Sequence, residues 1–215
     1  MTTPPHRSWA IVVAAGSGSR FGGAKQFESL GDRRVLDWSM QAARRNCDGV
    51  VCVLPADGDG DGSEIGADRT VPGGATRSAS VRAGLAVVPA DTDVIVVHDA
   101  ARPLAPDSLF RAVIQAIADG ADAAIPAVAL HDTIRHVDGA VVDRSQLVAV
   151  QTPQAFRAGA LRAAHADGGE ATDDASLVEA AGGTVVLVPG PAHNLKITDP
   201  ADLLIAAALL DQVDP

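Results

Sequence analysis

Residues 9–25 read WAIVVAAGSGSRFGGAK, and this stretch decides the fold. Its first part, Trp9–Ala14, is a continuous apolar and β-branched run, which is typical of a strand that is buried on both faces of a parallel sheet. The run ends in Ala15-Gly16-Ser17-Gly18, and two more glycines follow at Gly22 and Gly23. A buried strand that ends in a glycine-rich loop indicates an open α/β sheet, in which ligands bind at the carboxyl ends of the strands.

The rest of the chain alternates strands with helices. Beyond the first strand, we expect strands at Gly49–Leu54, Arg69–Val71, Asp93–His98, Ala123–Val128 and Thr184–Val188, and helices at Val35–Asn46, Ser78–Val88, Pro106–Asp119 and Ala158–Ala166, from Thr172-Asp173, and from Asp199-Pro200. This alternation predicts an α/β fold with a doubly wound, mostly parallel sheet. Without an internal repeat or a linker, residues 1–215 are expected to form a single domain.

One segment breaks the alternation. Residues His131–Gln151 alternate apolar and polar side chains and contain the turn signal Asp138-Gly139, which is typical of a β-hairpin. The segment has no obvious place in the main sheet. We therefore expect a hairpin arm inserted at about residues 131–151.

Composition excludes several classes of protein. Of the 215 residues, 47% are hydrophobic, enough for a sizeable core. The formal net charge of −10 argues against nucleic-acid binding, which needs a basic surface. The longest apolar stretch, Leu203–Leu210 with its flanking alanines, is too short to span a bilayer. Cys47 and Cys52 form neither a disulfide framework nor a metal-ligand pattern. We expect a cytoplasmic protein without a membrane or nucleic-acid partner.

The glycine-rich loop carries the strongest chemical signal, because Arg20 and Lys25 lie within it. Glycines let backbone N–H groups approach phosphates closely, and the two cations add positive charge. A dinucleotide fingerprint would need glycine where Phe21 stands, and a Walker A loop would need lysine directly after Gly23. Lys25 and Lys196 are the chain's two lysines, against 15 arginines. The loop predicts phosphate binding of another kind.

A second signal is VVHDAARP at residues 96–103, in which Asp99 and Arg102 follow a buried strand. Asp99 is suited to hold a ribose hydroxyl or to help place magnesium, and Arg102 to hold a phosphate. The competing interpretation is an internal Asp–Arg ion pair.

Other candidates are dispersed and by themselves would be surface residues. They are Arg77, Ser80, Thr133, Arg144 and Lys196. The stretch Asp57–Asp68 begins like a calcium loop, but Asp68 stands where glutamate should close it, so a solvated loop is favoured. His98, His131, His136, His165 and His193 show no ligand spacing and are predicted to be packing or surface residues.

Taken together, the motifs resemble one family. AAGSGSRFGGAKQF, GGATRSASV, VHDAARP, HDTIR, QTPQAF, TDDASLVE and NLKIT occur in the order expected of the 2-C-methyl-D-erythritol 4-phosphate cytidylyltransferases, from residue 9 to about 210. The resemblance implies a Rossmann-like nucleotidyltransferase fold and transfer of CMP from CTP to a small polyol phosphate, with release of pyrophosphate. It also implies Mg²⁺ or another divalent cation, held mainly through the CTP phosphates with Asp99 as a metal contact.

The resemblance assigns roles by position. Arg20, Lys25, Arg144 and Lys196 would be catalytic, with Arg20 and Lys25 stabilising charge on the triphosphate. CTP would be held by Ala14, Ala15, Gly16, Ser17, Gly18, Gly74, Ala75, Ser80 and Ala100. The acceptor would contact Asp99, Arg102, Thr133, Arg144 and Lys196, with Thr133 and Arg144 reaching across a homodimer on the arm.

The sequence departs from the family at two positions: Ala75 stands where an acidic residue is common beside the cytosine pocket, and His193 where aspartate is common. The nearest rival is ribitol 5-phosphate cytidylyltransferase, which shares these motifs. Hexose-1-phosphate nucleotidyltransferases fit less well, because their loop differs after the glycines. A catalytically silent nucleotide-binding protein is the alternative from another class, and the retained Arg20, Lys25 and Lys196 argue against it.

Overall fold

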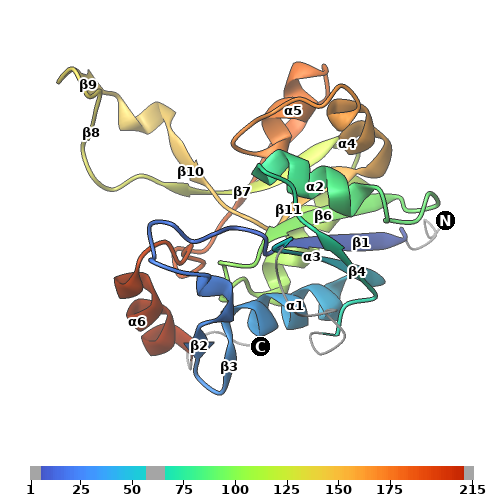
Figure 1. The fold of residues 1–215 in the computed structure, drawn as a ribbon. Coiled ribbons are helices and arrows are strands. Elements are labelled where there is room, and N and C mark those ends of the chain that lie inside the picture. The colour runs from blue at the N-terminus through green and yellow to red at the C-terminus, as the bar shows by residue number, and fades with distance from the viewer. Residues whose placement is uncertain (1–5, 57–65, 211–215) are drawn as a thin grey trace.

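The computed structural model describes residues 6–56 and 66–210, built around one eight-stranded sheet (Figure 1). The order is β10-β7-β11-β6-β1-β4-β5, and β12 also pairs with β7. The strands are β1 (Ser8–Val13), β4 (Gly49–Leu54), β5 (Arg69–Pro72), β6 (Val94–Asp99), β7 (Ala123–Ala129), β10 (Val148–Val150), β11 (Gln154–Arg157) and β12 (Val185–Pro189). The run β6-β1-β4-β5 is parallel throughout, as is the pair β7–β12.

Helices cover both faces of this sheet. They are α1 (Val35–Asn46), α2 (Arg77–Leu85), α3 (Asp107–Ala118), α4 (Ala158–His165), α5 (Asp174–Ala180) and α6 (Pro200–Leu209). Alternate residues of β1 point to opposite faces. Ala10 and Val12 pack with residues of α1 and α3, whereas Trp9 and Ile11 pack with residues of α2, α4 and α5. The predicted doubly wound, mostly parallel α/β sheet is confirmed.

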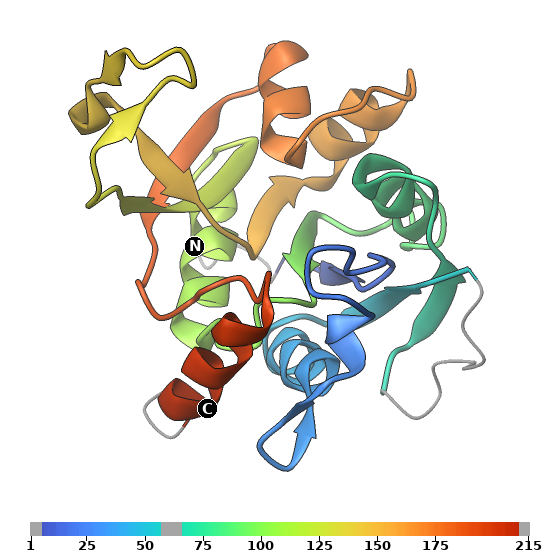
Figure 2. The ribbon, with the colours of Figure 1, turned by 60° about the vertical axis from the view of Figure 1, so that its left-hand side comes forward.

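A third, smaller cluster holds α6 beside a short hairpin, β2 (Ser29–Leu30) with β3 (Arg33–Arg34), which Figure 2 shows at the lower edge of the molecule. Leu30, Val35, Ile197 and Ala206 are buried in it. Helix α6 begins as its sequence predicts. Asp199 caps it by accepting hydrogen bonds from backbone N–H groups of the first turn, and Pro200 occupies the first helical position.

The structure corrects the prediction in the second half of the chain. Strand β11 was not predicted, although it lies in the middle of the sheet, antiparallel to both β6 and β7. Gln154, Ala155 and Phe156 are buried there, so the strand has no alternating pattern, and the cis bond between Thr152 and Pro153 leads into it. A four-residue strand with three buried residues, directly before a helix, is too short for its periodicity to be recognised.

The segment 131–151 is also not a hairpin throughout. Its first part forms a two-stranded ribbon, β8 (Ile134–Arg135) with β9 (Val141–Val142), which projects from the body in Figures 1 and 2. Its last part is β10, which pairs with the end of β7 on the same side as β11, opposite β12. Residues 131–147, which we call the arm, include no buried residue.

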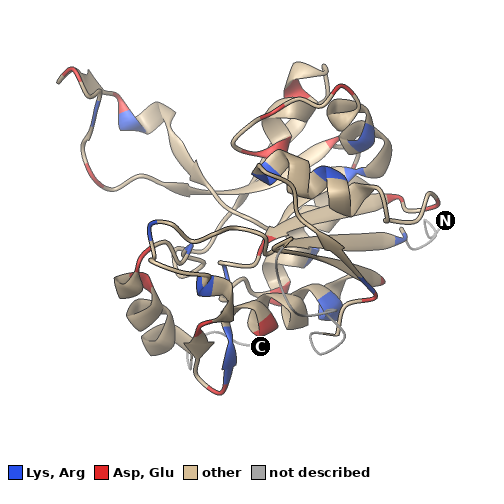
Figure 3. Cartoon of the chain, viewed as in Figure 1, with Lys and Arg blue, Asp and Glu red and all other residues tan. Residues whose placement is uncertain are grey.

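The structure locates the charged side chains, the apolar helices and the cysteines of the described residues. Figure 3 shows lysines and arginines spread over several elements, intermingled with acidic residues. No helix within residues 6–56 and 66–210 has the length and apolar character needed to cross a membrane. Cys52 is fully buried, and burial raises the pKa of its thiol to about 12, as expected of a packing residue. Residues 57–65 of the Asp/Gly-rich stretch lie outside the described residues.

Candidate active site

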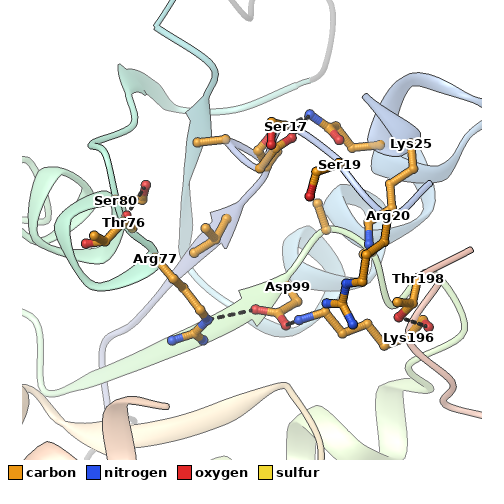
Figure 4. Close-up of a pocket in the computed structure, with 18 of the residues that line it drawn as sticks. Ser17, Ser19, Arg20, Lys25, Thr76, Arg77, Ser80, Asp99, Lys196 and Thr198 are labelled. Carbon is orange, nitrogen blue, oxygen red and sulfur yellow. Dashed lines mark hydrogen bonds and ion pairs between the residues drawn. The ribbon is translucent and has the colours of Figure 1, made fainter. Parts of the chain in front are cut away.

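A pocket of about 440 Å³ opens at the carboxyl ends of β1 and β6, beside the start of α2 (Figure 4). Many of the residues singled out in the sequence line it, although they come from four separate segments. They are Ala14, Ala15, Gly16, Ser17, Gly18, Arg20, Lys25, Gly74, Ala75, Ser80, Asp99, Ala100 and Lys196. The parallel run of strands brings these segments together, because its carboxyl ends meet at one edge of the sheet.

The glycine-rich loop folds tightly over the end of β1. The carbonyl of Gly18 accepts hydrogen bonds from the N–H groups of Phe21, Gly22 and Gly23, at 2.9, 2.9 and 3.3 Å. Gly18 has φ +65°, and a Cβ there would lie 1.7 Å from the carbonyl oxygen of Gly23. Glycine is therefore required at this position on two counts, its backbone conformation and the lack of space.

Gln26 fixes the loop from inside, a role that was not predicted. Its side chain is buried and donates to the carbonyl oxygens of Ala14, at 2.8 Å, and Gly16, at 3.1 Å. These bonds tie the end of β1 to the 3₁₀ turn η1 (Lys25–Phe27), which carries Lys25. The signal was present, since Gln26 belongs to the motif AAGSGSRFGGAKQF.

The opposite rim is the turn into α2. Thr76 caps the helix by accepting from the N–H of Ala79 at 3.0 Å, and Ser80 Oγ accepts from the N–H of Gly74 at 3.2 Å. A Cβ on Gly74 would lie 2.4 Å from Cβ of Ala79, so the close approach of turn and helix requires glycine. Ala75 is exposed and lines the pocket with its neighbours.

Four cations line the described pocket. Beside Arg77, these are Arg20 and Lys25 from the loop and Lys196 from the segment before α6 (Figure 4). Burial lowers the pKa of Lys25, and the positive charges of Lys196 and Arg20 lower it further. Mutual repulsion among neighbouring cations is relieved by a bound anion. The pocket is thus suited to a ligand with several negative charges.

Asp99 lies among these cations and is paired with two basic side chains. Its Oδ1 is 3.2 Å from Nε of Arg77, and its Oδ2 is 2.6 Å from Nζ of Lys196. Burial by itself would raise the pKa of Asp99, but the charges of Arg77 and Lys196 outweigh burial and hold it well below the usual range. Arg77 lines the pocket as well, and its central position was not predicted.

The backbone of Asp99 is held from the other side by a buried hydrogen-bond chain. The N–H of Asp99 donates to Thr152 Oγ1 at 3.0 Å, so the hydroxyl proton of Thr152 is free to donate to Nδ1 of His98 at 3.1 Å. Nε2 of His98 then carries the proton and donates to the carbonyl of Arg102 at 3.2 Å. Burial lowers the pKa of His98 to about 4, in keeping with a neutral ring. The prediction of a packing histidine is confirmed.

Arg102 does not pair with Asp99. It donates to the carbonyl of Asn194 at 2.7 Å and to that of Val150 at 3.3 Å, and it is absent from the described residues that line the pocket. The competing interpretation, an ion pair between Asp99 and Arg102, was therefore wrong: Asp99 is ion-paired, but not with Arg102. Arg77 and Lys196 take that place.

Two predicted residues, Thr133 and Arg144, lie on the arm. Both are exposed, and neither belongs to the described lining of the pocket. Within the arm, Val137 is fully exposed and Val141 is 61% exposed. The structure of one chain therefore brings together the loop, α2, Asp99 and Lys196, but not the arm residues.

The donor set limits how a metal could bind. Among the described residues, no three His, Cys, Asp or Glu side chains are grouped as a metal site, and Asp99 is the one carboxylate of the described pocket lining. Mg²⁺ in phosphate-transfer sites is held by one or two carboxylates together with substrate phosphates. The residues present fit a magnesium ion of that kind, with most of its ligands supplied by a nucleotide.

Comparisons with known proteins find similarity over nearly the whole chain. Residues 9–212 match the family described as 2-C-methyl-D-erythritol 4-phosphate cytidylyltransferase. A protein of that name from Frankia casuarinae is 45% identical over 218 residues, covering 96% of this chain and 82% of the relative. Another from Streptomyces coelicolor is 42% identical over 231 residues, covering 96% and 86%. The crystal structure of 2-C-methyl-D-erythritol 4-phosphate cytidylyltransferase from Thermus thermophilus matches with a TM-score of 0.83 at 38% identity, covering 96% of this chain and 100% of that one.

Proposed function

The chain belongs to the 2-C-methyl-D-erythritol 4-phosphate cytidylyltransferase family and is a cytidylyltransferase, and we propose that the pocket between β1, α2 and Lys196 is where it transfers CMP from CTP to that acceptor. The observation that carries this assignment is the convergence of Arg20, Lys25 and Lys196 on a glycine-lined pocket in an otherwise acidic protein.

CTP would lie across the glycine-rich loop. The backbone of Ala14–Gly18 and Ala100 would face the phosphates and ribose, while Gly74, Ala75 and Ser80 on the opposite rim would face the base. These segments line one pocket, and most of the side chains are too small to block approach to the backbone. Recognition of cytosine would then depend on backbone groups and Ser80, since Ala75 offers no polar side chain.

The reaction joins two anions. A phosphate oxygen of the acceptor attacks the α-phosphorus of CTP, a new P–O bond forms, and the bond to the β-phosphate oxygen breaks so that pyrophosphate leaves in line. The attacking phosphate is already ionised at neutral pH, so no general base is needed. Positioning and stabilisation of developing charge do most of the work. Arg20 and Lys25, which line the pocket, would stabilise the charge that collects on the departing phosphates.

A magnesium ion bound mainly by the CTP phosphates would neutralise part of their charge when present. Asp99 is the residue placed to approach such an ion, but both of its oxygens already face cations. We therefore assign Asp99 first to positioning Lys196 before the acceptor binds, and to the metal only through the nucleotide.

Thr133 and Arg144 would complete the acceptor site of a second copy of the chain, with the arm reaching across a homodimer. This proposal is supported by their absence from the described pocket lining of their own chain and by the uncovered apolar side chains Val137 and Val141. Arg102 would serve the same region from the base of the arm, since it bonds to Val150 next to it.

Acceptor choice is the decisive test of function. Pyrophosphate release from CTP and Mg²⁺ is measured with methylerythritol phosphate and with ribitol 5-phosphate under identical conditions. Ribitol phosphate carries more hydroxyls, and burying each without a partner costs roughly 1–3 kcal/mol, enough for a preference of about tenfold or more. We expect a higher kcat/KM for methylerythritol phosphate. Equal or reversed values would move the chain to the ribitol branch, and no release with either would favour a silent nucleotide-binding protein.

A further inference from the structure

Arg77 links Asp99 in the pocket to two buried residues, Asp174 and His165. It is the first residue of α2, and its guanidinium bridges two carboxylates: Nε lies 3.2 Å from Oδ1 of Asp99, and an Nη atom lies 2.7 Å from Oδ2 of Asp174. Figure 4 shows the Arg77 side chain directed toward Asp99. A cation at a helix N-terminus opposes the helix dipole, so this position gains nothing from α2 itself. The two carboxylates account for its place.

Asp174 lies between Arg77 and His165 in this series of contacts. It is the first residue of α5, its side chain is fully buried, and its Oδ1 lies 3.0 Å from Nε2 of His165. An ionised carboxylate only accepts hydrogen bonds, so Nε2 of His165 must donate. His165, the last residue of α4, is itself buried. Asp174 is thus held from outside the described pocket lining, by its place in α5 and by His165.

We propose that Arg77, held in place by Asp174 and His165, is a positioning residue that keeps the Asp99 carboxylate paired when Lys196 leaves it to bind the acceptor phosphate. The inference rests on the proposed function of the pocket. Without a ligand, Asp99 shares its charge between Arg77 and Lys196. A phosphate that enters competes with Asp99 for Lys196, and a carboxylate whose side chain is only 11% exposed is costly to leave without a partner.

The charges show why Arg77 suits this role. Burial would lower the pKa of Arg77, but Asp99 and Asp174 together reverse the effect and raise it, so the guanidinium stays charged. A planar guanidinium pairs with two carboxylates at once, which a lysine ammonium does less well. Without Arg77, the pairing of Asp99 would rest on Lys196, and Lys196 would be less available to the acceptor.

Arg82 provides a matched control on the same helix. It also joins α2 to the segment between α4 and α5, through the carbonyl of Gly169 at 2.8 Å and the carboxylate of Glu170 at 2.6 Å. It does not belong to the pocket lining of the described chain. A variant at Arg82 therefore loosens the docking of α2 without disturbing Asp99.

The experiment measures KM for each substrate in Arg77→Met, Asp174→Asn and Arg82→Met, with thermal unfolding to compare their folds. For Arg77→Met we expect the acceptor KM to rise about 10- to 100-fold, the range given by loss of one charge-assisted hydrogen bond, while the CTP KM changes less than about threefold. Asp174→Asn should shift the same constant by less, and it decides the question if Arg77→Met does not fold. Arg82→Met should resemble the wild type.

Several results would overturn the inference. One is an unchanged acceptor KM in folded Arg77→Met and Asp174→Asn, and another is a rise in the CTP KM alone, which would make Arg77 a nucleotide contact. A third is an equal effect in Arg82→Met, which would reduce Arg77 to helix docking. Failure of the proposed function is separate, because the wild type itself would then release no pyrophosphate.

Discussion

The glycine-rich loop and the arm both place cations at the surface, but they are held in different ways. Residues 14–25 are tied to the sheet by the buried Gln26 and lie beside Lys196 and Asp99. The arm is held largely by bonds within itself, such as those from Ser145 and Gln146 to Asp143, and its Val137 and Val141 are exposed. The loop therefore has its contacts within one chain, whereas Arg144 is exposed to solvent in one chain.

This difference separates two kinds of functional residue. A cation that converges with others on a pocket acts by its field on whatever binds there, and its effect is expressed within one subunit. A cation on an exposed ribbon has little electrostatic effect until a partner surface removes it from water. The comparison therefore predicts that a loop variant loses the activity of its own subunit, whereas an arm variant loses the activity of the neighbouring subunit in a dimer.

Removing a loop cation should give the largest effect. Lys25→Ala, and equally Arg20→Ala, is expected to lower kcat by about 10²–10³, or ~3–4 kcal/mol, because a preorganised charge is lost from the transition state. Turnover is compared at saturating CTP and acceptor, with circular dichroism to verify the fold. Near-normal turnover in folded Lys25→Ala would show that the loop is a binding turn without a catalytic cation.

Subunit mixing tests the arm. If Arg144 serves a neighbour's pocket, Arg144→Ala and Lys25→Ala should each be inactive alone, whereas a mixture should recover activity. In a two-fold dimer, about half of the mixed population is hybrid, and each hybrid has one intact site of two, so recovery should approach about a quarter of wild-type activity. The readout is pyrophosphate release after subunit exchange, with mass measured by light scattering. A monomer, or no recovery, would place Arg144 outside the catalytic site.

A smaller effect should appear in the pH dependence. The pKa of Lys25 is lowered by burial and then by Lys196 and Arg20, so its ammonium loses its proton at a lower pH than an ordinary lysine. The charge is present below that pKa and lost above it, so kcat/KM should decline on the alkaline side. Lys25→Arg keeps its charge throughout and should shift that decline to higher pH. The same alkaline profile in both proteins would assign the decline to another group.

Features made by consecutive residues could be predicted from the sequence, whereas contacts between residues far apart in the sequence could not. The loop that ends β1 was predicted with most of its pocket residues, because its strand, glycines and cations are consecutive. Strand β11 and the role of Gln26 were missed, since a short buried strand and a single amide carry no periodicity. The partners of Asp99 were also missed, because Arg77 lies 22 residues from it along the chain and Lys196 lies 97 residues from it.

The sequence by itself determined the α/β alternation, the family and the residues that the glycine-rich loop brings to the end of β1, since these depend on short runs whose backbone requirements are fulfilled within a few residues. Tertiary structure alone decided which cation pairs with Asp99, that Arg102 turns to Asn194, and that β10 joins the sheet while the arm stays exposed. The physical reason is that an ion pair or an edge strand is selected by the groups that folding brings within a few ångströms, and sequence distance does not encode that proximity.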